Sequence, residues 1–194
     1  MSNKRIKNIK KTLLSNNYYL LHKVTFDYKF RSGKWVTQSR EVYHRGHGAG
    51  ILLYNKTKQS ILLVKQFRMP TLETSHTEGF LIEICAGMLD EQDPITCIIR
   101  ETQEETGYKI KDVKKVYEAY SSPGVMTEKM HFFIGEYTDD MKVGSGGGLE
   151  SEHEDIEVLE MPFQEAVGML HAGEIHDSRT IILLQYALIH NLVQ

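Results

Sequence analysis

The alternation of apolar and polar positions divides the chain into many short extended segments and a few helical ones. Residues 20–30 alternate and carry β-branched and aromatic side chains, and extended character resumes at residues 35–37 after a polar turn, which predicts a hairpin. The apolar runs 49–54 and 61–66, separated by polar residues, predict a second hairpin. Further strands are predicted at residues 80–85, 113–120, 131–137 and 156–161.

Three segments have the spacing of helices. Residues 94–106 begin with Pro94, which suits the first position of a helix, and are followed by Gly107, which suits its end. Residues 162–172 and 178–192 also have helical periodicity. Because helices are inserted among many strands without regular alternation, the order predicts the α+β class.

Composition is that of an ordinary globular protein, with 194 residues, 41% hydrophobic and 25% charged. No apolar run approaches the roughly 20 residues that a membrane span needs, and the first residues are too polar for a signal peptide. The two cysteines, Cys85 and Cys97, have no metal-binding spacing, so we expect reduced thiols in a cytoplasmic protein. Residues 144–148, four glycines and a serine, predict a mobile loop.

Charge is distributed unevenly along the chain. Residues 1–45 carry eleven Lys and Arg against two acidic residues, whereas the remainder carries twelve against twenty-four. We therefore divide the chain into a β-rich arm, residues 1–45, and a body, residues 46–194. A basic arm could bind nucleic acid, dock on an acidic surface of a second copy, or present cations to a phosphorylated ligand. It carries no nucleic-acid motif, so we expect no nucleic-acid partner.

Residues 100–107, Arg-Glu-Thr-Gln-Glu-Glu-Thr-Gly, hold three glutamates. Glu101, Glu104 and Glu105 are spaced i, i+3 and i+4, so on a helix their side chains share one patch. Clustered carboxylate oxygens suit Mg²⁺ or Mn²⁺, with phosphate oxygens completing the coordination. Taken alone, the cluster is also typical of a solvated acidic face.

The flanking sequence favours a metal site. Residues 83–90, 93–94 and 100–108 together resemble the Nudix box, the loop–helix–loop motif of hydrolases that cleave a nucleoside diphosphate linked to another moiety. Two positions depart from the motif. Thr102 stands where an aliphatic residue is usual, and the turn before the helix is one residue short, so Asp93 is the nearest substitute for the early glutamate of the family.

The resemblance implies that Glu101 and Glu105 bind Mg²⁺, for which Mn²⁺ can substitute. The carbonyl of Ala86 would be a further metal ligand, and Glu104 would support Glu101 and Glu105 in catalysis. The resemblance also implies that Arg100 orients the glutamates by hydrogen bonding.

In the branch of the family that cleaves ADP-ribose and nucleotide sugars, the catalytic base lies on a downstream loop, which corresponds to residues 150–155 here. Glu152 and Glu154 are both candidates, as base or as additional metal ligand, and alignment of the following residues favours Glu154 as the metal-proximal one. A solvated acidic loop is the alternative for either residue. The loop is two residues longer than usual, and His153 between the glutamates is at most a substrate contact.

Stretches along nearly the whole chain resemble the bacterial GDP-mannose hydrolase subgroup of this family, namely residues 40–46, 51–55, 83–87, 131–137, 146–148, 154–160 and 173–179. The resemblance implies a Nudix fold, with mixed β-sheets sandwiched by helices and an N-terminal β-rich extension that contributes to a homodimer. It implies hydrolysis of GDP-mannose to GMP and mannose 1-phosphate. The alternatives are hydrolysis of ADP-ribose to AMP and ribose 5-phosphate, and a catalytically silent domain that binds a nucleotide.

Candidate substrate contacts follow from the same resemblance. Arg68 ends a strand before the box, and a guanidinium pairs well with phosphate oxygens, although a surface charge is the alternative. Glu128 follows a Ser-Pro-Gly turn that marks ADP-ribose-type enzymes of the family. The remaining implied contacts are Tyr18, Ala86, Gly87, Met88, Glu105, His153, Glu154 and Arg179, with Ser39, Arg40 and Glu41 reaching from the other subunit.

Overall fold

The computed structural model describes residues 4–74, 78–89 and 93–193. Its contacts divide the chain into two compact units. The first unit comprises Met1–His47 and Ala119–Lys129, and the second comprises Gly48–Glu118 and Met130–Gln194.

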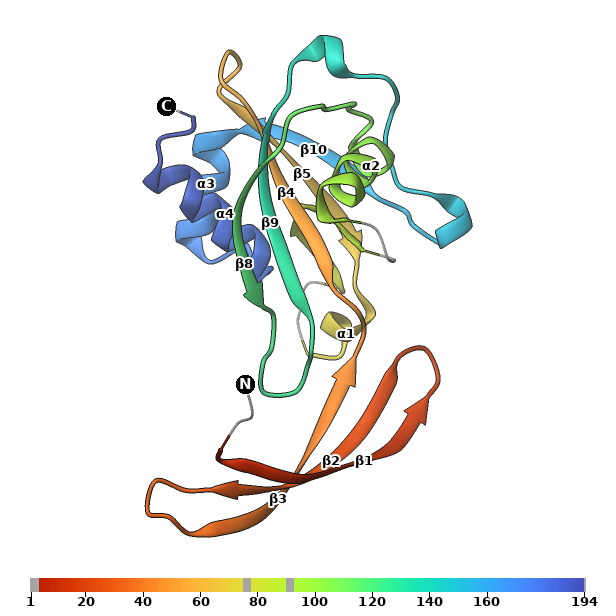
Figure 1. The fold of residues 1–194 in the computed structure, drawn as a ribbon. Helices are drawn as coiled ribbons and strands as arrows, with labels where there is room; N and C mark the ends of the chain where they lie inside the picture. Colours follow the sequence, from red (N-terminus) through yellow and green to blue (C-terminus); the bar gives the residue numbers. More distant parts are fainter. Residues whose placement is uncertain (1–3, 75–77, 90–92, 194) are drawn as a thin grey trace. The chain divides into compact units, whose positions relative to one another are not determined.

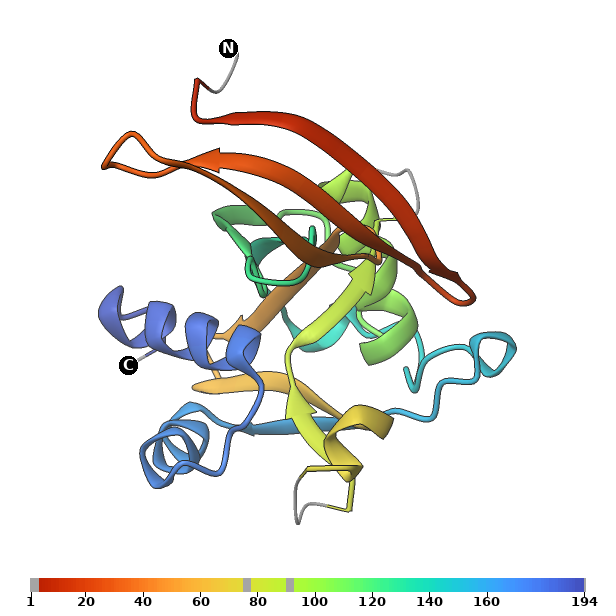
Figure 2. The ribbon, with the colours of Figure 1, turned by 90° about the horizontal axis from the view of Figure 1, so that it is seen from below.

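The first unit is built on an antiparallel sheet of three strands, β1 (Ile6–Asn16), β2 (Leu20–Lys29) and β3 (Trp35–His44), which run alongside one another in Figure 2. The predicted hairpin corresponds to β2 and β3, with β3 continuing to His44. Strand β1 was not predicted, because two shifts in its register with β2 interrupt the regular alternation of its side chains.

The segment Ala119–Lys129 joins this unit through main-chain hydrogen bonds. The amide of Tyr43 donates to the carbonyl of Val125 at 2.8 Å, and the amide of Thr127 donates to the carbonyl of Tyr43 at 3.1 Å. Among the residues of this unit that the structure describes, Glu128 alone is buried. The sheet therefore has no hydrophobic core within its own unit.

The second unit is built on a seven-stranded sheet in the order β10-β5-β4-β9-β8, in which β6 also pairs with β5 and β7 with β4 (Figure 1). The central pair β4–β9 is parallel, whereas the pairings of β5 with β4, β6 and β10 and of β4 with β7 are antiparallel. The strands are β4 (Gly48–Asn55), β5 (Ser60–Phe67), β6 (Phe80–Glu83), β7 (Cys85–Met88), β8 (Lys114–Tyr120), β9 (Lys129–Glu136) and β10 (Glu157–Pro162).

The strand predicted at residues 80–85 is divided in two. At Ile84 the main-chain amide donates to the hydroxyl of Thr180 at 2.8 Å, so it does not join the ladder of the sheet. Strand β6 therefore pairs with β5, and β7 moves across to pair with β4. This crossing carries the chain toward the beginning of the predicted box helix.

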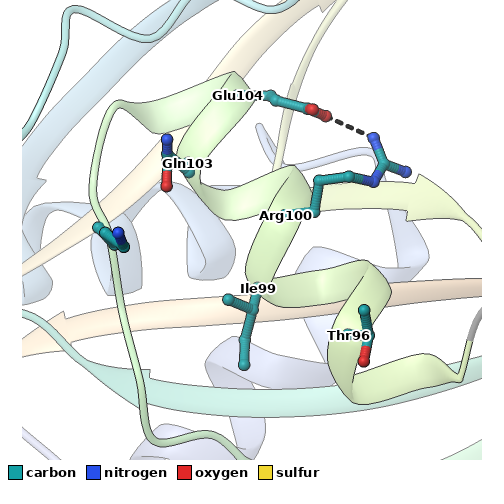
Figure 3. Close-up of a pocket in the computed structure, with 6 residues that line it drawn as sticks. Thr96, Ile99, Arg100, Gln103 and Glu104 are labelled. Atoms are coloured by element: carbon teal, nitrogen blue, oxygen red, sulfur yellow. Dashed lines mark hydrogen bonds and ion pairs between the residues drawn. The ribbon is translucent and has the colours of Figure 1, made fainter.

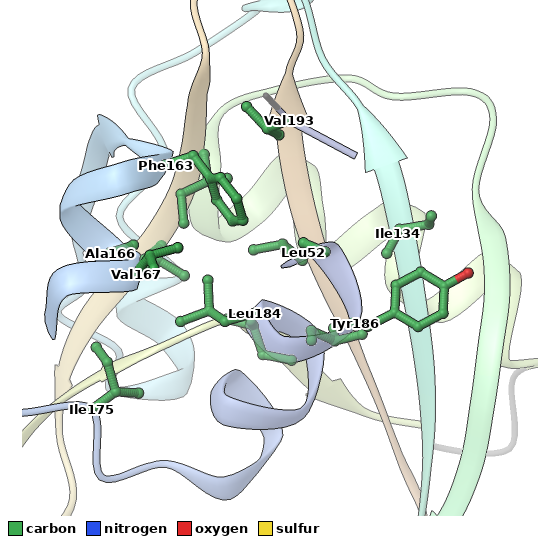
Figure 4. Packing of buried hydrophobic residues seen from close by; sticks show 14 of the residues in the cluster. Leu52, Ile134, Phe163, Ala166, Val167, Ile175, Leu184, Tyr186 and Val193 are labelled. Carbon is green, nitrogen blue, oxygen red and sulfur yellow. The ribbon is translucent and has the colours of Figure 1, made fainter. Parts of the chain in front are cut away.

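Strand β4 is buried on both faces, which explains its continuous apolar sequence. Leu52 packs into the cluster formed with α3 (Phe163–Ala172) and α4 (Ser178–Ile189), shown in Figure 4. Ile51 and Leu53 point to the opposite cluster, which contains Ile98 of α2 (Pro94–Thr106). The sheet is thus covered by α3 and α4 on one face and by α2 on the other, as the α+β prediction requires (Figure 1).

The short helix α1 (Met69–Leu72) follows β5 directly. Among the described residues, none of the helices has the length and apolar character needed to cross a membrane. Cys85 and Cys97 are both buried, and they form no disulfide bond with each other.

Candidate active site

Helix α2 begins and ends where the sequence predicts. The carboxylate of Asp93 caps its start by accepting hydrogen bonds from the amides of Ile95 and Thr96, at 3.0 and 3.1 Å. Gly107 ends the helix in the left-handed conformation, with φ of 78°. Asp93, the nearest substitute for the early glutamate of the box, is therefore an N-cap residue here. The shortened turn predicted before the helix includes residues 90–92, which lie outside the described residues.

Thr102 fits its buried aliphatic position because its hydroxyl has a local partner. The side chain is fully buried, and its hydroxyl donates to the carbonyl of Ile98 one turn earlier, at 2.7 Å. The departure from the box at this position therefore leaves the buried hydroxyl of Thr102 hydrogen-bonded.

The glutamates of α2 differ sharply in exposure. Glu101 and Glu105 are 8% and 1% exposed, whereas Glu104 is only partly buried. Burial raises the pKa of Glu101 to about 7, aided by the negative charges of Glu104 and Glu154 and opposed by Arg100. Burial also raises the pKa of Glu105 to about 8, aided by Glu101 and Glu154. A solvated acidic face would show neither feature, so Glu101 and Glu105 form a buried carboxylate pair.

Arg100 connects two of these glutamates. One of its terminal nitrogens donates to Glu101 at 2.7 Å, and the other donates to Glu104, as Figure 3 shows for the second pair. Arg100 and Glu104 also line a cavity of about 420 Å³ on the outer side of α2, together with Thr96, Ile99, Gln103 and Lys109. Glu101 and Glu105 do not line this cavity, so the buried pair faces a different side of the helix.

Strand β7 lies directly against the buried pair. The amide of Ala86 donates to the carboxylate of Glu105 at 3.2 Å. A Cβ atom added at Gly87 would lie 2.0 Å from the carboxyl carbon of Glu101, so a larger residue there would displace the side chain of Glu101 or the strand. Next along the strand, the carbonyl of Met88 accepts a hydrogen bond from the thiol of Cys97 at 3.1 Å. These contacts bring Ala86 and Gly87, both predicted site residues, to the two glutamates.

The glycine-rich loop, predicted to be mobile, is fastened to the end of α2. The amide of Gly147 donates to the carbonyl of Glu105 at 2.9 Å, and that of Gly148 donates to the carbonyl of Glu104 at 3.1 Å. The amide of Val143 donates to the carbonyl of Gly107 at 2.8 Å. These donors satisfy carbonyls that a helix end otherwise leaves unpaired, so the loop has a defined place beside the site.

Glu154, which follows this loop, is an acidic residue whose charge affects the pKa values of both buried glutamates. Its charge raises the pKa of Glu101 and of Glu105, and the charge of Glu152 also raises the pKa of Glu101. Glu152 ends a short 3-10 turn and is exposed. His153 follows in the left-handed conformation, with φ of 59°, and is also exposed.

Arg68 and Arg179, two predicted substrate contacts, converge on one buried carboxylate. Both guanidinium groups contact Glu83, at 2.8 and 2.9 Å, and the side chain of Glu83 is only 2% exposed. Asp177 holds Arg179 at 2.9 Å and also accepts hydrogen bonds from the amide and hydroxyl of Thr180. Glu83 and Asp177 are not predicted as site residues from the sequence, since nothing in their spacing shows that they meet the arginines.

The remaining predicted contacts belong to the first unit. Tyr18 is 86% exposed, and Ser39, Arg40 and Glu41 are exposed on β3. The hydroxyls of Ser39 and Thr25 are 2.9 Å apart, and Arg40 donates to the side chain of Gln38 at 2.9 Å. Glu128 is buried and pairs with Arg45 at 3.2 Å. Glu128 is thus already neutralised by a cation within its own unit.

The donor atoms of the buried pair suit a hard cation. Carboxylate and carbonyl oxygens are the ligands of Mg²⁺, and a cation would offset the burial and the mutual repulsion that raise both carboxyl pKa values. In the described part of the chain, no three His, Cys, Asp or Glu side chains gather closely enough to form a complete metal site.

Comparison with known proteins identifies the family to which this chain belongs. The NUDIX domain model matches residues 44–184, and the model of the GDP-mannose pyrophosphatase NudK N-terminal domain matches residues 5–43. The chain therefore belongs to the Nudix family.

Similarity to individual relatives extends over nearly the full length. The GDP-mannose pyrophosphatase of Yersinia enterocolitica is 52% identical over 190 residues, covering 98% of each chain. The proteins of the same name from Pectobacterium atrosepticum and Salmonella arizonae are 50% and 49% identical over 181 and 185 residues. The first covers 93% of each chain, and the second covers 95% of this chain and 96% of its own.

Proposed function

We propose that the protein is a Mg²⁺-dependent pyrophosphohydrolase that cleaves GDP-mannose to GMP and mannose 1-phosphate. The observation that carries the reaction class is the buried pair Glu101 and Glu105 on the box helix, next to Ala86. The substrate follows from the relatives, because chains named GDP-mannose pyrophosphatase match along both units.

Metal binding would use Glu101, Glu105, the carbonyl of Ala86 and Glu154. When bound, Mg²⁺ neutralises the charge of the diphosphate and lowers the pKa of a bound water. Arg100 holds the carboxylate of Glu101 in place, and the amide of Ala86 does the same for Glu105. The chain thus positions its ligands through neighbouring donors, as metal sites commonly do.

Proton transfer from the attacking water requires a carboxylate that is free to receive it. Glu152 suits this role, because it is exposed on the acidic turn (residues 150–155) and its charge raises the pKa of Glu101. Glu104 is less suited, since its carboxylate is engaged by Arg100. Glu154 would then serve as metal ligand, in keeping with its effect on both buried glutamates.

Binding of the substrate phosphates would use Arg68 and Arg179. Their pairing with Glu83 orients both guanidinium groups, and the side chain of Arg68 remains 37% exposed to meet a ligand. Further contacts are proposed from Gly87, Met88 and His153, and from residues of the first unit, namely Tyr18, Ser39, Arg40, Glu41 and Glu128.

The first unit supports a homodimer with active sites shared between subunits. Its described residues include no buried hydrophobic side chain, and three of its large hydrophobic residues, Ile9, Leu13 and Trp35, are 61%, 52% and 37% exposed. A small sheet without an apolar core is marginally stable alone, so it needs a covering surface. Sedimentation equilibrium should give twice the chain mass, and a monomer at micromolar concentration would contradict this assembly.

The substrate is tested by a panel of GDP-mannose, ADP-ribose, ADP-glucose and dinucleotide polyphosphates with Mg²⁺. We expect GDP-mannose to be hydrolysed with the highest kcat/KM of the panel. Analysis of the products formed in ¹⁸O water then identifies the attacked phosphorus. Much faster turnover of ADP-ribose would make the protein an ADP-ribose pyrophosphatase instead. Absence of turnover with tight nucleotide binding would identify a silent binding domain.

A further inference from the structure

The loop that follows β9 is attached to the main chain of the residues that carry the site. The carbonyls of Glu104 and Glu105 accept the amides of Gly148 and Gly147, at 3.1 and 2.9 Å. The amide of Ile156, beyond the acidic turn, in turn donates to the carbonyl of Gly147 at 3.1 Å. The end of α2 is therefore tied to the segments on both sides of the acidic turn.

Two glycines allow this close approach. A Cβ atom on Gly146 would lie 2.4 Å from the carbonyl oxygen of Glu105, and φ at Gly146 is 70°. A Cβ atom on Gly148 would lie 2.6 Å from both Cβ and Oε2 of Glu154, and φ at Gly148 is 80°. Both positions require glycine for space and for backbone conformation.

The next residue orients the carboxylate of Glu154. The amide of Leu149 donates to Oε2 of Glu154 at 3.1 Å, and the amide of Glu154 donates to the carbonyl of Leu149 at 3.2 Å. These two bonds close the acidic turn upon itself. One oxygen of the carboxylate is thereby fixed by the main chain, and the other is available to a cation.

We infer that Gly148 and the amide of Leu149 are positioning elements of the active site, which hold the carboxylate of Glu154 at a fixed place relative to Glu101 and Glu105. Gly148 acts through Glu154, because it supplies the space in which that side chain lies. The inference rests on the proposed function in one respect, the role of Glu154 as a metal ligand. It adds a physical reason for glycine beside the acidic turn.

The experiment measures binding of Mn²⁺ to the full-length protein without substrate, by electron paramagnetic resonance of the free ion. Gly148→Ala should weaken binding by about tenfold or more, as loss of a supporting contact commonly does. Gly173→Ala is the matched control, because φ at Gly173 is 74° but no atom lies within 4 Å of an added Cβ. The control carries the same backbone strain and should bind Mn²⁺ as the parent protein does.

A double-mutant comparison separates positioning from general damage. In the Glu154→Gln protein, Gly148→Ala should change Mn²⁺ affinity by less than about twofold, since the carboxylate through which it acts is absent. An undiminished effect in that background would overturn the inference, as would equal affinities of Gly148→Ala and Gly173→Ala. If Glu154→Gln itself leaves Mn²⁺ affinity unchanged, both the metal role of Glu154 and the positioning inference fail.

Hydrogen exchange provides a second measurement if Gly148→Ala does not fold. In Glu154→Ala, the amide of Leu149 should exchange faster than in the parent protein, because its acceptor is removed. The amides of Gly147 and Gly148 should keep their protection, since their acceptors are carbonyls of α2. Unchanged exchange at Leu149 would overturn the inference.

Discussion

The amide of Ala86 donates a hydrogen bond to the carboxylate of Glu105, 3.2 Å away. This bond joins β7 to α2 at the point where both contribute to the site. The same residue, Ala86, offers its carbonyl as a proposed metal ligand, so the two groups are placed by one local contact. Removing the carboxylate should therefore affect the reaction far more than the fold.

Glu105→Gln should lower kcat on the order of 1,000-fold, because a neutral amide neither balances the charge of a divalent ion nor coordinates it well. The glutamine keeps the size of the side chain and can still accept from Ala86. Steady-state hydrolysis of GDP-mannose measures the effect. Glu165→Gln, at an exposed acidic residue in the first turn of α3, is the control and should retain parental activity. Activity of Glu105→Gln within tenfold of the parent would exclude Glu105 as a metal ligand.

Without metal, stability should fall as pH rises. The pKa values of Glu101 and Glu105 are raised by burial to about 7 and about 8, from 4.5 in the unfolded chain. Between pH 4.5 and 8 the folded state therefore binds more protons than the unfolded state, so the free energy of unfolding decreases with pH. Thermal unfolding in a chelator should show Tm falling from pH 5 to pH 8.

Two comparisons check the origin of this decrease. Glu105→Gln in the chelator should show a shallower decline of Tm, because one of the two titrating groups is gone. Mg²⁺ should raise the Tm of the parent protein more at pH 8 than at pH 6, since the ion binds the ionised carboxylates. Parallel Tm curves for parent and variant would contradict the assignment.

Gly87→Ala should disturb the site by crowding Glu101. The added Cβ would lie 2.0 Å from the carboxyl carbon, so the side chain of Glu101 or strand β7 must move. We expect a loss of about 1–3 kcal/mol in the free energy of unfolding, as in other overpacked sites, and weaker Mn²⁺ binding. Gly168→Ala, in α3 with no atom within 4 Å, should leave Mn²⁺ binding unchanged. Equal Mn²⁺ affinities of the two variants would show that the close approach of Gly87 to Glu101 does not affect metal binding.

Glu83→Gln should leave Arg68 and Arg179 without their shared counter-charge. Both guanidinium groups lose a charged partner that is itself buried, and we expect a cost of about 3 kcal/mol in the free energy of unfolding. KM for GDP-mannose should rise because the arginines are less well oriented. Chemical denaturation and initial rates measure the two effects. Glu157→Gln breaks an exposed pair with Lys65 at 3.7 Å and should change neither quantity appreciably.

The sequence predicts the box helix closely, because its signals are local. Pro94, the charge spacing and Gly107 each act within a few residues, and the helix covers residues 94–106 as expected. Strand β1 is missed because its register shifts remove the alternation on which strand prediction depends. The division of residues 80–85 into β6 and β7 depends on Thr180, almost one hundred residues away in sequence.

The same distinction applies to the site. Glu101 and Glu105 are identified by their spacing together with the flanking box sequence. Arg68, Glu83 and the pair Asp177 and Arg179 come instead from three separate segments, and no spacing in the sequence shows that they meet. The glycine-rich segment was predicted to be mobile because glycine permits many conformations. In the structure its amides pair with the end of α2, a contact that only the tertiary fold creates.

The parallel pairing of β4 with β9 has a consequence for synthesis on the ribosome. Its register places Gly48 beside Met130, so the middle of the large sheet cannot close until most of the chain has emerged. The strands of the first sheet, by contrast, are joined by short turns and can pair early. The nascent chain therefore exposes the apolar side chains of these strands well before the second unit is complete. During that interval the exposed apolar side chains favour aggregation.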